Sequence, residues 1–194
     1  FYVYDKTDDQ ISGERLRDEN GNFVTTETPE EKDRVIVGYA QPKLTMGWDN
    51  RFTFRNWDLN LFFTGVFGQK IFNEPRAAFS YLGDVSAGKN ILADAPNYQR
   101  IGDSYSSLPS DRWIEDGSYF KLSTATLGYT FRNCFDGWLS DIRLYVSANN
   151  IFTITGYKGR DPEINLGGLE PGCDTRTDHF PRSRQILVGA TVNF

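Results

Sequence analysis

The sequence predicts an all-β protein whose strands form a segment of a transmembrane antiparallel β-barrel. Three observations predict this class. Five stretches alternate apolar and polar residues with the period of two that is typical of strands. All eight prolines lie outside these stretches, as they must where strands are hydrogen-bonded on both sides. The connections run long, short, long, short, long, which is the rhythm of outer loops and periplasmic turns.

The first hairpin follows an amino-terminal region with little periodicity. Residues 1–43 start with a short alternating run and then become polar, with a turn signal at Asn20-Gly21, so we expect an end strand and a long outer loop. Strong alternation begins at 44, runs to 54, and resumes over 57–67. Arg55 and Asn56 lie between the two runs, which is the length of a two-residue turn. We therefore expect a hairpin over 44–67.

A second hairpin is predicted over 119–152, after an outer loop at 68–118. That loop is rich in Gly, Ser, Asp, Asn and Pro, with a short helix expected around 75–82. So long a loop counts against a compact soluble domain, but it is ordinary on an outer-membrane barrel. We expect strands at 119–131 and 142–152 joined by a turn over 132–141. A further outer loop covers 153–184.

The last stretch, 185–194, reads Q-I-L-V-G-A-T-V-N-F and predicts the strand that closes the barrel. Its length matches the ~9 to 11 residues that a tilted strand needs to cross a bilayer. Leu187 is the one exception to its alternation. We expect the Phe194 ring to lie at the periplasmic interface and to end the strand that the outer-membrane assembly machinery recognises. The residues expected to face lipid are Ile186, Val188, Ala190, Val192 and Phe194.

Charge is concentrated in the connections. Of 21 basic and 26 acidic residues, the five strands hold only Asp49, Arg51, Asp58, Lys121 and Arg143. Simple alternation places all of these except Lys121 opposite the apolar face, so they are expected to face the lumen, as wall ion pairs rather than as substrate contacts. Lys121 falls on the apolar face near the outer end of its strand, where a lysine can snorkel to the interface. A lipid-facing Lys or Arg at the midplane would cost roughly 2–4 kcal/mol.

Composition excludes several other classes. Hydrophobic residues make up 39% of the chain, and no apolar run approaches the ~18 residues of a membrane helix. The net charge of −5 argues against a nucleic-acid partner, for which a basic stripe is expected. The chain begins with Phe1 and shows no signal peptide, so we expect a fragment or a processed product.

No enzymatic constellation is present, and we expect no catalytic residue, cofactor or metal. His179 is the only histidine, and no Gly-x-Ser-x-Gly motif accompanies it. Cys134 and Cys173 lack zinc spacing and are predicted on opposite sides of the membrane, too far apart for a disulfide. Four loop carboxylates could hold calcium but lack EF-hand spacing, and Asx-turns explain them more simply. They are Asp103, Asp111, Glu115 and Asp116.

Four loop aromatics are candidates for contact with a substrate or with a covering partner protein. They are Tyr98, Tyr105, Trp113 and Tyr157. Exposed aromatic rings stack on sugars or pack against other proteins. Packing within the loops is the alternative, and it is favoured.

Several stretches resemble the C-terminal part of SusC/RagA-like TonB-dependent outer-membrane transporters. Their order and spacing, over most of the chain, carry the resemblance more than any single motif does. The stretches are D-R-V-I-V-G (33–38) followed by Pro42; W-I-E-D-G-S-Y-F-K-L-S-T-A-T-L-G-Y-T-F (113–131); I-R-L-Y-V-S-A-N-N-I-F-T-I-T-G-Y (142–157); G-R-D-P-E-I-N (159–165); and F-P-R-S-R-Q-I-L-V-G-A-T-V-N-F (180–194).

The resemblance implies a barrel of 22 strands with an N-terminal plug, in the outer membrane of a Gram-negative bacterium. Such proteins import glycans, oligosaccharides or peptides beneath a SusD-like surface lipoprotein that acts as a lid. Because five or six strands cannot close that barrel, the chain is expected to be its C-terminal portion. Its partners are then outer-membrane lipids, the rest of the barrel and the plug, the lid, and the TonB complex through an N-terminal region absent here. The alternative is a small structural or adhesive barrel, or an extracellular β-rich binding module.

Overall fold

The computed structural model describes residues 18–21, 36–97, 111–134, 139–163, 172–174 and 181–193, with only the backbone described at 133, 134 and 139. The chain divides into two compact units. The strand unit comprises Pro42–Gly68, Gly117–Gly156 and Phe180–Phe194. The loop unit comprises Phe1–Gln41, Gln69–Asp116 and Tyr157–His179.

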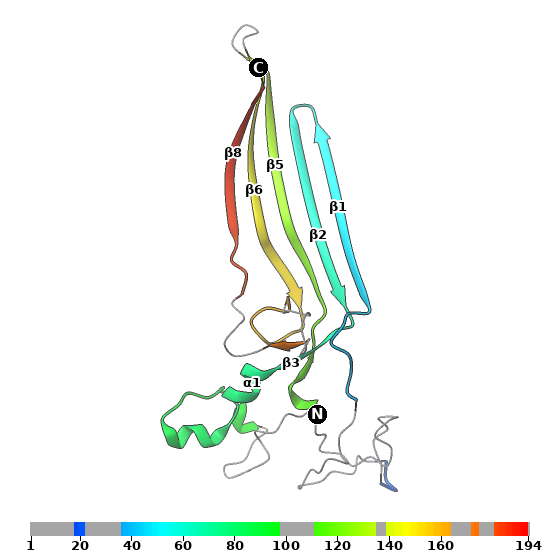
Figure 1. The fold of residues 1–194 in the computed structure, drawn as a ribbon, viewed down its shortest axis with the longest axis vertical. Coiled ribbons are helices and arrows are strands. Elements are labelled where there is room, and N and C mark those ends of the chain that lie inside the picture. The colour runs from blue at the N-terminus through cyan, green and yellow to red at the C-terminus, as the bar shows by residue number, and fades with distance from the viewer. Residues whose placement is uncertain are drawn as a thin grey trace. The chain divides into compact units, whose positions relative to one another are not determined.

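The strand unit is one five-stranded antiparallel sheet (Figure 1). Neighbouring strands follow in the order β1-β2-β5-β6-β8, and every neighbouring pair is antiparallel. The predicted arrangement, five antiparallel strands adjacent in chain order, is therefore confirmed. β1 and β8 form the two edges of the sheet. The strands are β1 (Leu44–Phe54), β2 (Trp57–Phe67), β5 (Tyr119–Cys134), β6 (Leu139–Thr155) and β8 (Gln185–Asn193).

The first hairpin has its predicted bounds, and its turn is fixed to a third strand. Arg55 and Asn56 join β1 to β2, and the Arg55 backbone adopts the left-handed region with φ of 55°. The Asn56 side chain donates to the Thr130 carbonyl at 2.7 Å, while the Thr130 N–H donates to the Asn56 carbonyl at 2.8 Å. This reciprocal pair anchors the turn to β5.

The second hairpin is longer than the sequence predicted. β5 continues to Cys134 and β6 begins at Leu139, so the predicted ten-residue turn over 132–141 is wrong. Arg132 and Asp141, the first and last residues of the predicted turn, face each other as a cross-strand pair. β6 also runs on to Thr155, three residues past its predicted end.

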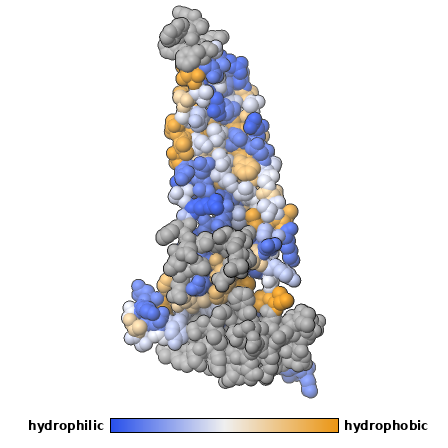
Figure 2. Space-filling model, in the orientation of Figure 1, coloured by the Kyte–Doolittle hydropathy of each residue, from blue (hydrophilic) through white to orange (hydrophobic). Residues whose placement is uncertain are grey.

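One face of the sheet, here the apolar face, exposes large hydrophobic side chains on every strand. Val188 is 79% exposed and Ile186 is 75% exposed. In Figure 2, orange residues lie along the margin that β8 forms. Soluble monomers rarely expose a continuous apolar surface of this extent. The exposed side chains of this face are Leu44, Met46, Trp48, Phe52, Phe54, Trp57, Leu127, Phe131, Leu144, Val146, Phe152, Ile154, Ile186, Val188 and Val192.

The opposite face, here the polar face, carries every charged residue of the five strands. The register places each of them in a row of polar or small residues rather than in an apolar row. Charge is therefore excluded from one face of the sheet, which sharpens the segregation that the sequence predicted. The residues are Asp49, Arg51, Asp58, Lys121, Arg132, Asp141 and Arg143.

A bulge explains why Lys121 belongs to the polar face, so its expected position on the apolar face is wrong. Phe62 pairs with Thr124 and Phe63 with Leu122, which leaves Ser123 as an extra residue in β5. One extra residue inverts the alternation of a strand beyond it. Lys121 consequently pairs with Thr64 on one side and Thr153 on the other.

β6 has its own irregularity at the same height but keeps its alternation. Leu122 pairs with Phe152 and Thr124 with Asn149, so two residues of β6 lie opposite Ser123. Two extra residues leave the alternation of β6 unchanged. Asn150, one of the two, adopts φ of 55°, and its side chain donates to the Ser183 carbonyl at 2.9 Å. Asparagine is among the residues that tolerate this backbone region best.

The loop unit contains a short three-stranded sheet that sequence periodicity did not predict. β3 (Lys70–Asn73) pairs antiparallel with β4 (Ile114–Asp116) and parallel with β7 (Cys173–Asp174). These strands come from both long connections and tie them together. Short 3-10 helices accompany them: η2 (Leu82–Ala87), η3 (Ala95–Asn97) and η4 (Asp111–Trp113).

The predicted short helix is confirmed as α1 (Glu74–Phe79). The Asn73 side chain caps it by accepting from the Arg76 N–H at 3.0 Å, and Pro75 occupies the first turn, where its missing N–H has no cost. In the part of the chain that the structure describes, no helix has the length and apolar character to cross a membrane. The turn at Asn20-Gly21 is also confirmed, with Gly21 at φ of 81°, while the end strand expected before it lies outside the described residues.

Candidate functional site

Two clusters of polar side chains are candidates for function. One lies on the polar face of the strand unit, and the other joins the segments of the loop unit. The first contains the four charges predicted to face a lumen. The second contains two of the predicted loop aromatics.

An ion pair crosses the polar face from β6 to β2. Arg143 donates from Nε to Asp58 Oδ1 at 2.9 Å and from Nη2 to Asp58 Oδ2 at 2.5 Å, and both side chains are about one-third exposed. This two-bond geometry is the strongest form of Arg–carboxylate contact. β5 lies between the two residues. The prediction of an ion pair within this wall therefore describes Asp58 and Arg143 correctly.

Gly128 of β5 makes this crossing feasible. A Cβ at this position would lie 2.5 Å from Asp58 Oδ1 and 2.6 Å from Arg143 Nη2. Any other residue would force the two side chains to move. Glycine inside a strand often marks such a close approach, so the sequence itself contains a signal for this crossing.

Gly189 plays the same part on the other side of β6. Gly189 of β8 pairs with Tyr145 of β6, and a Cβ on Gly189 would lie 2.4 Å from the Tyr145 ring. The Arg143 guanidinium lies 5.0 Å from the centre of that ring, within cation–π range. Asp58, Arg143 and Tyr145 thus form one continuous strip that covers both glycines.

Hydroxyl and amide pairs continue the polar face from this strip toward the end of the sheet from which the long connections leave. Thr126 bonds Ser147 at 2.8 Å, Thr124 donates to Asn149 at 3.1 Å, and Thr64 bonds Ser123 at 2.7 Å. Asp49 and Arg51 lie on the edge strand β1 and are exposed. A wall of this kind suits water or a hydrated partner.

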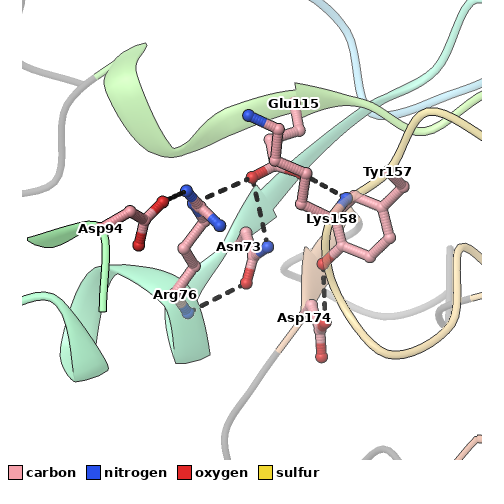
Figure 3. A network of polar contacts seen from close by, with 7 residues as sticks. All are labelled: Asn73, Arg76, Asp94, Glu115, Tyr157, Lys158 and Asp174. Carbon is pink, nitrogen blue, oxygen red and sulfur yellow. Dashed lines mark hydrogen bonds and ion pairs between the residues drawn. The ribbon is translucent and has the colours of Figure 1, made fainter. Parts of the chain in front are cut away.

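In the loop unit, the Glu115 carboxylate joins three segments (Figure 3). Oε1 accepts from Asn73 Nδ2 at 3.3 Å and lies 3.7 Å from Arg76 Nε, while Oε2 accepts from the Lys158 N–H at 2.8 Å. Arg76 also pairs with Asp94 at 2.5 Å. Glu115 therefore holds β4, the start of α1 and the chain after β6 together.

The predicted contact residues Trp113 and Tyr157 are buried in the loop unit. Trp113 is 2% exposed and Tyr157 is 6% exposed, and the Tyr157 hydroxyl donates to Asp174 Oδ2 at 2.6 Å. Burial, together with that hydrogen bond, raises the pKa of Tyr157 far above its usual value, so the hydroxyl stays protonated. These positions match the internal packing that the sequence analysis favoured. Their contact with a substrate or a lid remains a prediction.

The remaining predicted residues are described in part. Tyr98, Tyr105, Asp103, His179 and Phe194 lie outside the described residues. Glu115 and Asp116 pair with the chain's own cations, Asp116 with Lys70 at 3.4 Å. Among the residues with described positions, no three His, Cys, Asp or Glu side chains gather as a metal site would require. The Cys134 side chain is not described, so the absence of a disulfide to Cys173 also remains a prediction.

Sequence comparison finds relatives of one kind, although no family model matches. The chain is 33% identical over 203 residues to TonB-dependent receptor P3 of Formosa agariphila and 25% identical over 204 residues to receptor P26 of the same organism. It is 25% identical over 209 residues to TonB-dependent receptor SusC of Bacteroides thetaiotaomicron. These alignments cover 96%, 95% and 100% of this chain but only 19%, 20% and 19% of the relatives.

Solved structures agree on the fold. The RagAB peptide importer in its closed-closed state matches with a TM-score of 0.77 and 23% identity, over 95% of this chain and 21% of that one. The RagAB peptide transporter matches with a TM-score of 0.70 and 23% identity, over 92% of this chain and 20% of that one. The sheet and its loops are thus an arrangement that occurs inside a larger barrel protein.

Proposed function

Since the chain is homologous to TonB-dependent receptors, SusC among them, and spans about a fifth of their length, we propose that it forms part of the barrel wall and outer loops of a TonB-dependent importer. Its place is the outer membrane of a Gram-negative bacterium. The five strands form one arc of the wall, as the C-terminal portion of the barrel. The rest of the polypeptide supplies the other strands, the plug and the contact to the TonB complex.

The separation of the two faces of the sheet carries this proposal. The apolar face exposes side chains that each gain roughly 1.5–3 kcal/mol when they leave water. The polar face holds all the strand charges, and one of them on the lipid side would cost roughly 2–4 kcal/mol at mid-membrane. A bilayer on one side and a wet lumen on the other satisfies both faces. Outer-membrane lipids are therefore the partner of the apolar face.

The connections indicate which end of the strands faces outward. Both long connections, β2 to β5 and β6 to β8, leave from the same end of the antiparallel sheet, and they contain all the elements of the loop unit. The short connections lie at the other end. Since outer-membrane barrels have long extracellular loops and short periplasmic turns, we assign the loop unit to the cell surface.

The cargo and the lid follow from the relatives. SusC and the RagAB peptide importer are the named proteins that this chain resembles. On that basis the cargo is a glycan, an oligosaccharide or a peptide, taken up beneath a SusD-like surface lipoprotein. A strain that lacks the gene should lose uptake of one of these cargo classes while its growth on free monosaccharides and amino acids stays normal.

Neighbouring residues of β8 provide a direct test of the two faces. Val188 belongs to the apolar face and Leu187 to the polar face, and both are exposed in the sheet. Single cysteines at the two positions would carry nitroxide labels in purified outer membranes. The label at 188 should be accessible to oxygen and protected from a water-soluble nickel complex. The label at 187 should be less accessible to oxygen and more accessible to the nickel complex.

Equal access of the nickel complex to both labels would contradict a membrane wall. That result would favour the alternative of an extracellular β-rich module. A small structural or adhesive barrel would instead preserve the label pattern but show no dependence of uptake on TonB. The label accessibilities and the TonB dependence of uptake together distinguish the importer, the extracellular module and the small barrel.

A further inference from the structure

The β1–β2 turn places an arginine in a backbone conformation that arginine rarely adopts. Arg55 has φ of 55°, a region that glycine, asparagine and aspartate occupy far more readily. A glycine at this position would form the turn with less strain. A residue kept in a disfavoured conformation motivates the search for a role of its side chain.

The turn holds the Arg55 guanidinium beside the apolar face. Its Cζ lies 5.3 Å from the centre of the Phe54 ring, and Phe54 is an apolar-face residue that is 69% exposed. The two hydrogen bonds between Asn56 and Thr130 fix the turn to β5. The turn that carries the cation is therefore fixed to three strands.

A row of aromatic side chains, here the aromatic belt, runs from Phe54 across the sheet through Trp57 and Tyr129 to Phe131. Trp57 meets Tyr129 edge-on with ring centres 4.8 Å apart, and Tyr129 meets Phe131 at 4.7 Å. Trp57 and Phe131 are exposed on the apolar face. Such aromatic rows mark the level at which the hydrocarbon of a bilayer gives way to the lipid headgroups.

We propose that Arg55, at the edge of the aromatic belt, binds the phosphate of a phospholipid headgroup in the leaflet that the β1–β2 turn reaches. The inference rests on the proposed function, because it requires the apolar face to meet lipid. The seven charges of the strands all lie on the polar face, whereas the Arg55 guanidinium lies against an apolar-face ring. A guanidinium is matched to phosphate oxygens in charge and in geometry. Short turns face the periplasm, so the ligand is a phospholipid of the inner leaflet.

Titration of the full-length protein with phosphatidylglycerol, followed by native mass spectrometry, tests the proposal. Arg55→Gln removes the cation and should weaken the Kd for the first bound lipid by about fivefold, the effect of one interfacial cation. Arg55→Gly should weaken binding of the first lipid equally, although it relieves the backbone strain of the turn. Arg55→Lys should lie between these variants and the wild type. Arg132→Gln is the matched control, because it removes a cation at the same end of the sheet but on the polar face.

Three results would overturn the site: Arg55→Gln binds within twofold of the wild type, Arg132→Gln weakens binding equally, or lipid A binds in preference to phosphatidylglycerol. The proposed function is checked separately, by recovery of the wild-type protein as a heat-modifiable band in outer membranes. If that band is missing, the membrane assignment itself fails. If it is present while the lipid titration is insensitive to Arg55, only the headgroup site fails.

Discussion

The strand unit and the loop unit place apolar and polar groups in opposite ways. The strand unit exposes its large apolar side chains and arranges its polar ones in rows on the other face. The loop unit buries Ile71 and Trp113 and, beside them, the polar side chains of Asn73, Ser80 and Asp174. The first arrangement suits two different surroundings, one on each face. The second suits a compact body in water.

The two units also differ in the kind of contact that defines them, although both join residues far apart in the chain, as Asp58 and Arg143 are in the strand unit. In the strand unit each residue's face is set by its position along a strand and by its partners across the sheet. In the loop unit, Glu115 reaches residues 42 and 43 positions away in the chain, Asn73 and Lys158. Separate perturbations should therefore damage one unit and leave the other intact.

The largest effect is expected from deletion of 192–194 in the strand unit. Val192 and Asn193 pair with Ile142 and Asp141, so their loss leaves backbone groups of β6 without partners in lipid, where each such group costs several kcal/mol. Assembly into the outer membrane should be abolished, as measured by heat-modifiable gel mobility. Phe194→Tyr is the matched mild change, since it keeps the ring. Normal assembly of the deleted chain would refute the role of this strand in closing a barrel.

Glu115→Ala should open the loop unit and leave the strand unit assembled. It removes the acceptor for Asn73 and the Lys158 N–H and the ion-pair partner of Arg76, and we expect a loss of about 2–4 kcal/mol. Limited proteolysis on intact cells should cut the loops faster while the heat-modifiable band persists. Asp116→Ala is the adjacent control, because its exposed pair with Lys70 contributes less than about 1 kcal/mol. Equal cleavage of both variants would show that Glu115 stabilises the loop unit no more than Asp116 does.

Gly128→Ala should loosen the strand unit by a smaller amount. The new methyl group displaces the Arg143–Asp58 pair, at a cost of about 1–2 kcal/mol for a charged contact that is about one-third exposed. Gly47→Ala is the control, because a Cβ there would lie 3.5 Å from the Phe62 ring, an ordinary contact. The temperature at which the heat-modifiable band unfolds should fall for the first variant only. An unchanged temperature would mean that the pair adds nothing to the wall.

The smallest effect concerns alkaline pH in the loop unit. The pKa of Tyr157 is raised in the folded chain, so its protonated form contributes stability that is present below about pH 10, the unfolded pKa, and is lost as the pH rises above it. The loops of the wild type should become more sensitive to protease above that pH. Tyr157→Phe should lose about 1 kcal/mol at neutral pH with the bond to Asp174, and should lack this alkaline step. An identical alkaline step in the variant would assign it to another group.

The sequence predicts an element correctly wherever neighbouring residues alone decide where the element begins and ends. β1 and β2 have their predicted bounds because two residues separate two clean alternations. The predicted ends of β5 and β6 are wrong because the predicted turn includes Arg132 and Asp141, which belong to the polar face, where charge is allowed. The helix α1 was predictable because Asn73 and Pro75 act within the first turn.

The rest depends on partners that no local pattern reveals. β3, β4 and β7 are four, three and two residues long, too short for a period to be seen. For Trp113 and Tyr157 the sequence leaves both contact with a ligand and internal packing open, with packing favoured, because the burial that the structure shows depends on the fold of the whole unit. Of the polar strip, the charges were found from alternation. Its glycines were not, because their meaning depends on the side chains that cross them.

The extra residue Ser123 has a consequence for how this kind of wall changes over generations. Thr124 and Leu122, on either side of it, already pair with the adjacent residues Phe62 and Phe63 of β2. Removal of that one codon would therefore close the bulge and leave 119–122 on their present faces. Deletion of a codon elsewhere in β5 would instead exchange the faces of every residue on one side of the gap. Ser123 is thus the position at which β5 tolerates the loss of one residue. A relative that lacks the extra residue needs an alignment gap here, because without one its residues before this point would be assigned to the wrong side of the sheet.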